Sequence, residues 1–174
     1  MKGFVVGILV CLAAVAGAGW FYFAMGHAPV AVADPAMPFE KYLAKTALAS
    51  RIAKETPKVS PVPADEPNLL AGAATYKQNC AVCHGLPDGP RTNIAEGLFP
   101  RPPQLLRGVG VTDDPPWETY WKAANGIRLS GMPSFKAKLS EVQLWQVSQL
   151  LAHADKIPDS VKKVLADTRA PAGR

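Results

Sequence analysis

The chain has 174 residues, which is enough for one ordinary domain together with some additional segments. Its formal charge of +5 does not indicate nucleic-acid binding, because the basic residues are dispersed and no run of Lys and Arg alternates with aromatic residues. A mildly basic surface is better suited to steering the chain toward an acidic protein partner.

The N-terminal segment of residues 3–25 is uncharged and mainly apolar. It is long enough for a helix to cross a hydrocarbon core about 30 Å thick. Lys2 precedes it and no basic residue follows before Lys41, so the short positive end should stay in the cytoplasm and the remainder should be exported. We therefore predict a transmembrane anchor over residues 1–26.

A cleaved signal peptide is the alternative for this segment. Ala31-Val32-Ala33 offers a small-residue cleavage site directly before Asp34. The apolar run is longer than the core of about 7–15 residues that signal peptides usually have, which favours an uncleaved anchor. In both cases the main domain lies outside the cytoplasm.

Residues 27–64 are predicted to form a proline-rich stalk that contains one amphipathic helix. Residues 27–38 carry three prolines and no helical period. Residues 38–56 repeat apolar side chains near helical spacing, namely Phe39, Tyr42, Leu43, Ala47 and Ile52, so this helix should rest on the domain or on the membrane surface. A second proline-rich linker follows, and the compact domain should therefore begin near Asp65.

The compact domain is predicted over residues 65–155, and its first helix over residues 66–79 with Asp65 as N-cap. The buried stripe of this helix should consist of Leu69, Ala73, Tyr76 and Cys80. A second helix is predicted over residues 115–125, where Gly126 ends it. Its apolar face should consist of Trp117, Tyr120, Trp121 and Ala124.

The third helix should begin at Ser140, where Ser-Glu-Val-Gln forms a capping box, and end near His153. Its apolar stripe should consist of Leu144, Val147 and Leu151, widened by Trp145 and Leu150. Residues 85–114 are rich in glycine and proline and show no strand pattern, and the tail of residues 156–174 should contain a short helix at 159–166 before it frays. An all-α domain this small with loops this long requires a non-protein group in its core.

Residues 79–89 read Asn-Cys-Ala-Val-Cys-His-Gly-Leu-Pro-Asp-Gly. A structural zinc site needs four ligands, and this domain has no second pair of cysteines. A thioredoxin-like redox pair requires a β-α-β context, and a disulfide here would close a very short loop and stabilise little. Cys-x-x-Cys-His is the attachment sequence of c-type haem, so we predict one haem c bound covalently through Cys80 and Cys83, with His84 as an iron ligand.

The sixth iron ligand is predicted to be Met132, which is the sole methionine after this motif. Haem iron held by His and Met is the electron-transfer arrangement. Gly131 and Pro133 form a turn that can hold the methionine side chain toward the iron. The alternative is that Met132 fills a gap in a loop or in the core.

The segments NCAVCHG, GMPSF and LSEVQLWQVSQLL resemble class I c-type cytochromes, in particular small membrane-anchored monohaem cytochromes of bacteria that are related to the haem subunits of cbb3-type oxidases. The resemblance covers about residues 66–155. It implies an all-α class I cytochrome c fold around one covalent haem, with the N-terminal transmembrane helix outside it. It also implies that Gly72 and Tyr76 of the first helix cross the last helix near Trp145.

The same resemblance implies that a proline carbonyl accepts a hydrogen bond from the Nδ1 of the histidine ligand, and Pro102 and Pro103 are the candidates. The haem propionates need donors as well, and arginine is suited to pairing with a carboxylate. The candidate donors are Arg101, Arg107, Arg128, Trp117 and Trp121, each of which is otherwise a surface charge or a packed aromatic residue.

These features together predict a membrane-tethered cytochrome c that transfers single electrons between respiratory proteins, such as a periplasmic dehydrogenase and a terminal oxidase. It should span the bacterial inner membrane once, with the haem domain on the periplasmic side, and act as an electron carrier without a small-molecule substrate. The alternatives are a fixed haem subunit of a dehydrogenase or oxidase, a haem-based gas sensor and a peroxidase-like enzyme. The last two need an open sixth position at the iron.

Overall fold

The computed structural model describes residues 1–107 and 112–167, so the predicted fraying of residues 168–174 lies outside the described residues. The chain divides into two compact units, Met1–Ala47 and Leu48–Arg174. The first contains α1 (Lys2–Ala24), an exposed helix that is long and apolar enough to cross a membrane, although an N-terminal signal sequence passes the same test. Helix α2 (Glu40–Glu55) begins in the first unit and ends in the second.

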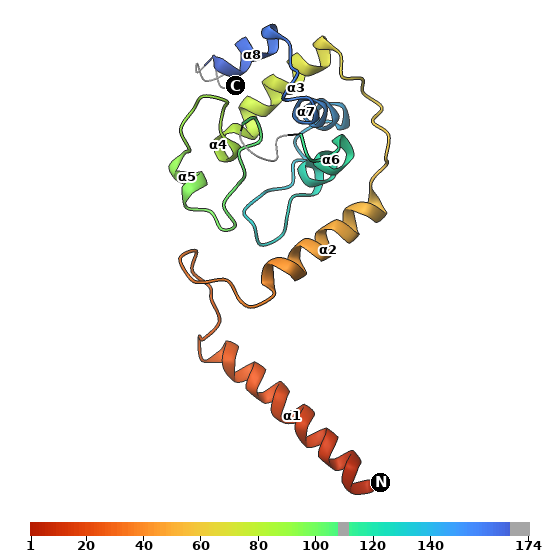
Figure 1. The fold of residues 1–174 in the computed structure, drawn as a ribbon, viewed down its shortest axis with the longest axis vertical. Helices are drawn as coiled ribbons and strands as arrows, with labels where there is room; N and C mark the ends of the chain where they lie inside the picture. The colour runs from red at the N-terminus through yellow and green to blue at the C-terminus, as the bar shows by residue number, and fades with distance from the viewer. Residues whose placement is uncertain (108–111, 168–174) are drawn as a thin grey trace. The chain divides into compact units, whose positions relative to one another are not determined.

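The described part of the second unit is helical and contains no strand, which confirms the predicted fold class. Its helices after α2 are α3 (Glu66–Asn79), α4 (Ala81–His84), α5 (Asn93–Glu96), α6 (Pro116–Asn125), α7 (Glu141–Ala152) and α8 (Asp159–Ala166). Helix α5 was not predicted, because a four-residue turn is too short to show a period. Figure 1 shows α3 and α7 crossing, with α6 beside α7 and α8 beside α3.

Local sequence explains where the main helices begin. The side chain of Asp65 accepts a hydrogen bond from the backbone N–H of Asn68 at 3.1 Å, which satisfies one of the free donors at the start of α3. At the start of α7, Ser140 and Gln143 form the complete capping box. These two starts agree with the prediction, because N-cap signals lie within a few residues of the helix that they begin.

The crossing of α3 and α7 depends on a glycine. A Cβ atom added at Gly72 would lie 2.4 Å from the backbone oxygen of Gln146, so the two helices approach too closely there for any side chain. Beyond this point the core consists of apolar side chains from α3, α7 and the C-terminal segment, namely Leu69, Ala73, Tyr76, Val147, Leu150, Leu151, Ile157, Val161 and Leu165. Helix α6 joins this framework through Tyr120, whose ring stacks on Trp145 with centroids 4.1 Å apart.

Apolar packing continues past residue 155 at the C-terminal end. We predicted a tail from residue 156, but Ile157, Val161 and Leu165 are buried in the main core. The short helix at 159–166 is present as α8, and its apolar face packs on α3. One short amphipathic helix does not reveal from sequence alone whether it docks.

Two apolar residues before Asp65 are also buried. Ile52 at the end of α2 is 2% exposed, and Val62 of the following linker is 8% exposed. The carbonyl of Val62 accepts a hydrogen bond of 2.7 Å from Nε2 of Gln149, a residue of α7. Ile52 and Val62 are therefore buried, and Val62 is bonded to α7, although most residues between them are exposed.

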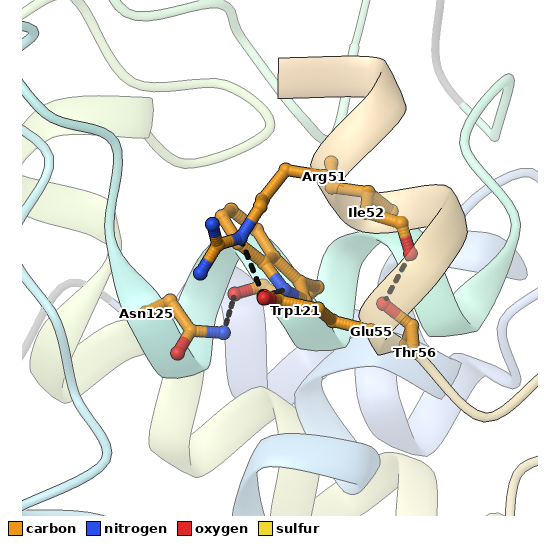
Figure 2. A network of polar contacts seen from close by, with 6 residues as sticks. All are labelled: Arg51, Ile52, Glu55, Thr56, Trp121 and Asn125. Atoms are coloured by element: carbon orange, nitrogen blue, oxygen red, sulfur yellow. Dashed lines mark hydrogen bonds and ion pairs between the residues drawn. The ribbon is translucent and has the colours of Figure 1, made fainter. Parts of the chain in front are cut away.

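Figure 2 shows how the end of α2 contacts α6. The indole Nε1 of Trp121 donates to Glu55 at 3.0 Å, and Arg51 forms an ion pair with the same carboxylate at 2.5 Å. Directly after α2, the hydroxyl of Thr56 donates to the carbonyl of Ile52 at 2.9 Å. Of the five apolar residues predicted to line the amphipathic face, Ile52 alone is buried, while Phe39, Tyr42 and Leu43 are 62–76% exposed.

Candidate functional site

The two cysteines and the histidine lie on a single helical turn that follows α3 directly. The N–H groups of Cys83 and His84 both donate to the carbonyl of Cys80, at 3.1 and 2.9 Å. This turn places the three residues at spacings of three and four, which is the spacing of neighbours on one face of a helix. Both thiols are free and partly buried, so two sulfur nucleophiles lie close to one imidazole.

The thiol of Cys80 is held in its neutral form. Burial raises its pKa to about 12, and the nearby Cys83 contributes in the same direction. A thiol with so high a pKa is protonated at neutral pH, and it reacts slowly with oxidants, which attack the thiolate. Cys80 is therefore a weak nucleophile at neutral pH in this fold.

The ring orientation of His84 is fixed by one hydrogen bond. Its Nδ1 lies 2.9 Å from the carbonyl oxygen of Pro103, and because a carbonyl only accepts, Nδ1 carries the proton. The other nitrogen, Nε2, then has the free lone pair that a metal ion requires. Burial lowers the pKa of His84, and the hydrogen bond to Pro103 opposes this in part, so the imidazole is neutral at pH 7. Of the two prolines considered, Pro103 is the one that makes this contact.

Tyr76 joins α3 to the residue after the histidine. Its hydroxyl donates to the carbonyl of Gly85 at 2.7 Å, and its side chain is fully buried. Gly85 has a φ of 76°, in the left-handed region that favours glycine, which lets the chain turn sharply after His84. The buried tyrosine thus fixes the exit of the Cys-x-x-Cys-His turn.

Replacing Tyr76 by Phe should change how stability depends on pH. Burial raises the pKa of Tyr76, so its contribution to stability is complete below the unfolded pKa of about 10 and is lost as the pH rises further. At pH 8 the variant should be less stable by about 1 kcal/mol because Gly85 loses its donor. Above pH 10 the difference should shrink, because only the parent has this residue to ionise on unfolding.

Urea unfolding of the ferrous protein at pH values from about 8 to 11 measures this difference. A difference that stays constant over that range would contradict the prediction. Tyr22, which lies in α1, provides a matched Tyr→Phe control in the other compact unit.

Met132 lies in a turn that is fixed to the end of α6. Its carbonyl accepts from the N–H of Ile127 at 3.1 Å, and the hydroxyl of Ser134 donates to the carbonyl of Ala124 at 2.6 Å. Gly131 has a φ of 73°, and a Cβ atom added there would lie 2.7 Å from the side chain of Leu98. The turn therefore packs against the long loop after His84, and the Met132 side chain is partly buried. Its role as an iron ligand stays a prediction.

Several of the predicted propionate donors already have protein partners. The indole N–H of Trp121 donates to Glu55. The ammonium nitrogen of Lys58 lies 3.5 Å from the centroid of the Trp117 ring, which is a cation–π contact. Arg107 donates to protein carbonyl oxygens. The structure thus gives these three candidates other contacts, which come from residues far away in the sequence. Arg101 and Arg128 are exposed and form no hydrogen bond or ion pair within the described residues, so their role stays a prediction.

Sequence reasoning missed two polar residues beside the histidine. Arg91 donates to the carbonyl of Pro102 at 2.9 Å, and the side chain of Gln104 lies against Gly85. Neither residue belongs to a periodic pattern or a motif, so no local signal in the chain points to them. Their place becomes visible only when the loops of residues 85–91 and 102–107 are brought together.

The residues present fit a covalently bound haem. Two free thiols and a histidine with a bare Nε2 form the donor set of that cofactor. Within the described residues, two buried side-chain N–H groups have no hydrogen-bond partner, Nε1 of Trp145 and Nε2 of Gln104. Buried donors in native proteins are normally satisfied, so both are available to a further group. The described residues contain no group of three or more His, Cys, Asp and Glu side chains suited to a metal ion alone.

In this helical domain the Cys-x-x-Cys-His turn follows α3 directly, and the turn that contains Met132 lies between α6 and α7. Cys-x-x-Cys-His is the attachment sequence of c-type haem. Residues 67–151 match the family model described as cytochrome c oxidase, cbb3-type, subunit III, and this part of the chain is a cytochrome c domain of that type. The resemblance drawn from the sequence is thereby confirmed. Comparisons with curated proteins and with solved structures gave no match. A cytochrome c domain implies covalent haem c, electron transfer and redox protein partners.

Proposed function

We propose that this chain is a membrane-tethered monohaem cytochrome c that transfers single electrons between respiratory redox proteins on the periplasmic side of a bacterial inner membrane. One observation carries the proposal: directly after two free thiols, His84 donates from Nδ1 to Pro103, within a domain of the cytochrome c family. That hydrogen bond selects the tautomer of an iron-binding imidazole and raises its basicity.

The proposed roles follow from the chemistry of each group. Cys80 and Cys83 hold the haem through thioether bonds, and His84 and Met132 are the axial ligands. Bound haem c supplies a one-electron couple. The thioether of Met132 favours the reduced metal, while the hydrogen bond from His84 to Pro103 favours the oxidised metal. In this proposal the protein sets a reduction potential and acts as an electron carrier.

Helix α1 supports the membrane tether. It is long and apolar enough to span a bilayer, and Lys2 at its start favours a cytoplasmic N-terminus. In this proposal residues 3–25 stay in the membrane as a single pass. A tether keeps the haem domain near membrane-bound partners and so raises its effective concentration.

A second candidate function is that of a fixed haem subunit in an oxidase complex. The description of the matching family, subunit III of a cbb3-type oxidase, favours it. The chemistry at the iron is the same in both cases, and only the assembly differs. Mild detergent extraction followed by native electrophoresis with haem staining separates the two, because a free carrier migrates alone and a subunit migrates with its complex.

Intact-protein mass spectrometry tests the proposed function. The purified protein should carry the mass of one haem, while the double variant Cys80→Ala/Cys83→Ala, which has no thiol left to form a thioether, should carry none. Cys11→Ala is the matched control, since Cys11 lies in α1, and this variant should retain the haem. The same mass shows whether the residues before Asp34 are retained. Absence of a haem adduct from the parent would contradict the carrier proposal, and loss of the N-terminal segment would contradict only the tether.

A further inference from the structure

We infer that Arg91 and Arg107 are positioning residues that hold the Pro103 carbonyl against His84. The inference rests on the proposed function, in which His84 binds the iron. It concerns two loops, residues 85–91 after the histidine and residues 102–107 around its hydrogen-bond acceptor.

Arg91 fixes the peptide group that precedes the acceptor. Its Nη1 donates to the carbonyl oxygen of Pro102 at 2.9 Å, and its side chain is partly buried. The ring of Pro103 locks φ near −65°, so ψ is the single soft backbone torsion between this peptide group and the carbonyl that His84 uses. Holding the Pro102 carbonyl therefore restricts the direction of the next carbonyl as well.

Arg107 acts on the other side of the acceptor. Its Nε donates to the side-chain oxygen of Gln104 at 3.2 Å, and its Nη1 and Nη2 donate to the carbonyls of Pro87 and Gly89 at 3.3 and 2.8 Å. One guanidinium thus bridges the residue after Pro103 and the loop that follows the histidine. The guanidinium holds its donors in one rigid plane, whereas the three donors of an ammonium group rotate freely.

Gln104 transmits this contact to the histidine turn. A Cβ atom added at Gly85 would lie 2.5 Å from its Oε1, so the amide lies directly on the backbone beside His84. Both loops are therefore held together on the two sides of Pro103, by Arg91 before it and by Gln104 with Arg107 after it. The result is a carbonyl with little freedom to turn away from Nδ1 of His84.

A persistent hydrogen bond at Nδ1 has a measurable consequence. It protects the Nδ1 proton from exchange with solvent, and it makes the imidazole a stronger donor to iron, which favours the oxidised state. Weakening the two arginine contacts should therefore speed this exchange and raise the reduction potential. The same substitutions remove a nearby positive charge. Losing that charge favours oxidised iron and therefore lowers the reduction potential, opposite to the effect of the weaker hydrogen bond.

The test measures exchange of the His84 Nδ1 proton by NMR in the ferrous haem-loaded protein. Arg91→Gln and Arg107→Gln should each speed exchange by about tenfold, the factor that the loss of one ordinary hydrogen bond allows. Arg107→Lys keeps the charge but not the fork, so it should also speed exchange, and it should raise the potential. Lys138→Gln, an exposed residue outside both loops, is the control for charge loss and should leave exchange unchanged.

Exchange rates equal to the parent's in both the Arg91 and Arg107 variants would overturn the inference, even if unfolding shows that the variants are less stable. Loss of a propionate contact would alter the potential without altering exchange, and that result also counts against it. If one variant does not fold, the other carries the test. A parent in which His84 does not bind iron contradicts the proposed function instead, and its spectrum shows this before any variant is made.

Discussion

Replacing Met132 by Ala is expected to remove the weak sulfur-to-iron charge-transfer band of the ferric protein and to lower its reduction potential. The thioether favours ferrous iron, so its loss shifts the couple toward ferric iron. The shift should be on the order of 0.2 V, a moderate part of the roughly 0.8 V over which axial ligands tune haem proteins. The backbone of the turn should persist, because its bonds come from Ile127, Ser134 and the end of α6.

Near-infrared absorption and a redox titration measure the two effects of this substitution. Met37→Ala is the matched control, since Met37 lies in the first compact unit, and it should keep both band and potential. A parent without the band, with a high-spin spectrum that shifts on adding carbon monoxide after reduction, would contradict the prediction. Such a protein would have an open iron, and a gas sensor or a peroxidase would then replace the carrier.

Replacing Gly72 by Ala is expected to destabilise the folded domain by about 3 kcal/mol, at the upper end of the range for overpacking. The added Cβ would lie 2.4 Å from the backbone oxygen of Gln146 and 3.2 Å from the Cβ of Leu150. The closest atom belongs to the backbone of α7, so no side chain can rotate to make room. Either α3 and α7 must separate, or a turn of α7 must distort.

Urea unfolding followed by far-ultraviolet circular dichroism measures this loss. Gly97→Ala is the matched control, because Gly97 has a φ of −85° and an added Cβ would meet its nearest atom at an ordinary 3.5 Å. That variant should stay within about 0.5 kcal/mol of the parent. If Gly72→Ala were equally mild, the close crossing of α3 and α7 would be wrong.

The sequence by itself determined the main helices and the chemistry of the central motif. Helices α3, α6 and α7 begin and end within a residue of their predicted bounds, because caps, glycine stops and apolar periods act over one or two turns. The Cys-x-x-Cys-His motif could be recognised for the same reason, because one helical turn brings its two sulfurs and its imidazole together. A single sequence is enough wherever the interacting groups are this close along the chain.

Only the tertiary structure decided which contacts join distant segments. It selected Pro103 over Pro102 as the acceptor for His84, and it gave Trp121 a partner in Glu55. It also placed α8 and the linker residue Val62 in the domain, although neither has a sequence pattern strong enough to indicate docking. The physical reason is the same in each case: a hydrogen bond or a packed methyl group between residues far apart in sequence leaves no periodic trace in either segment.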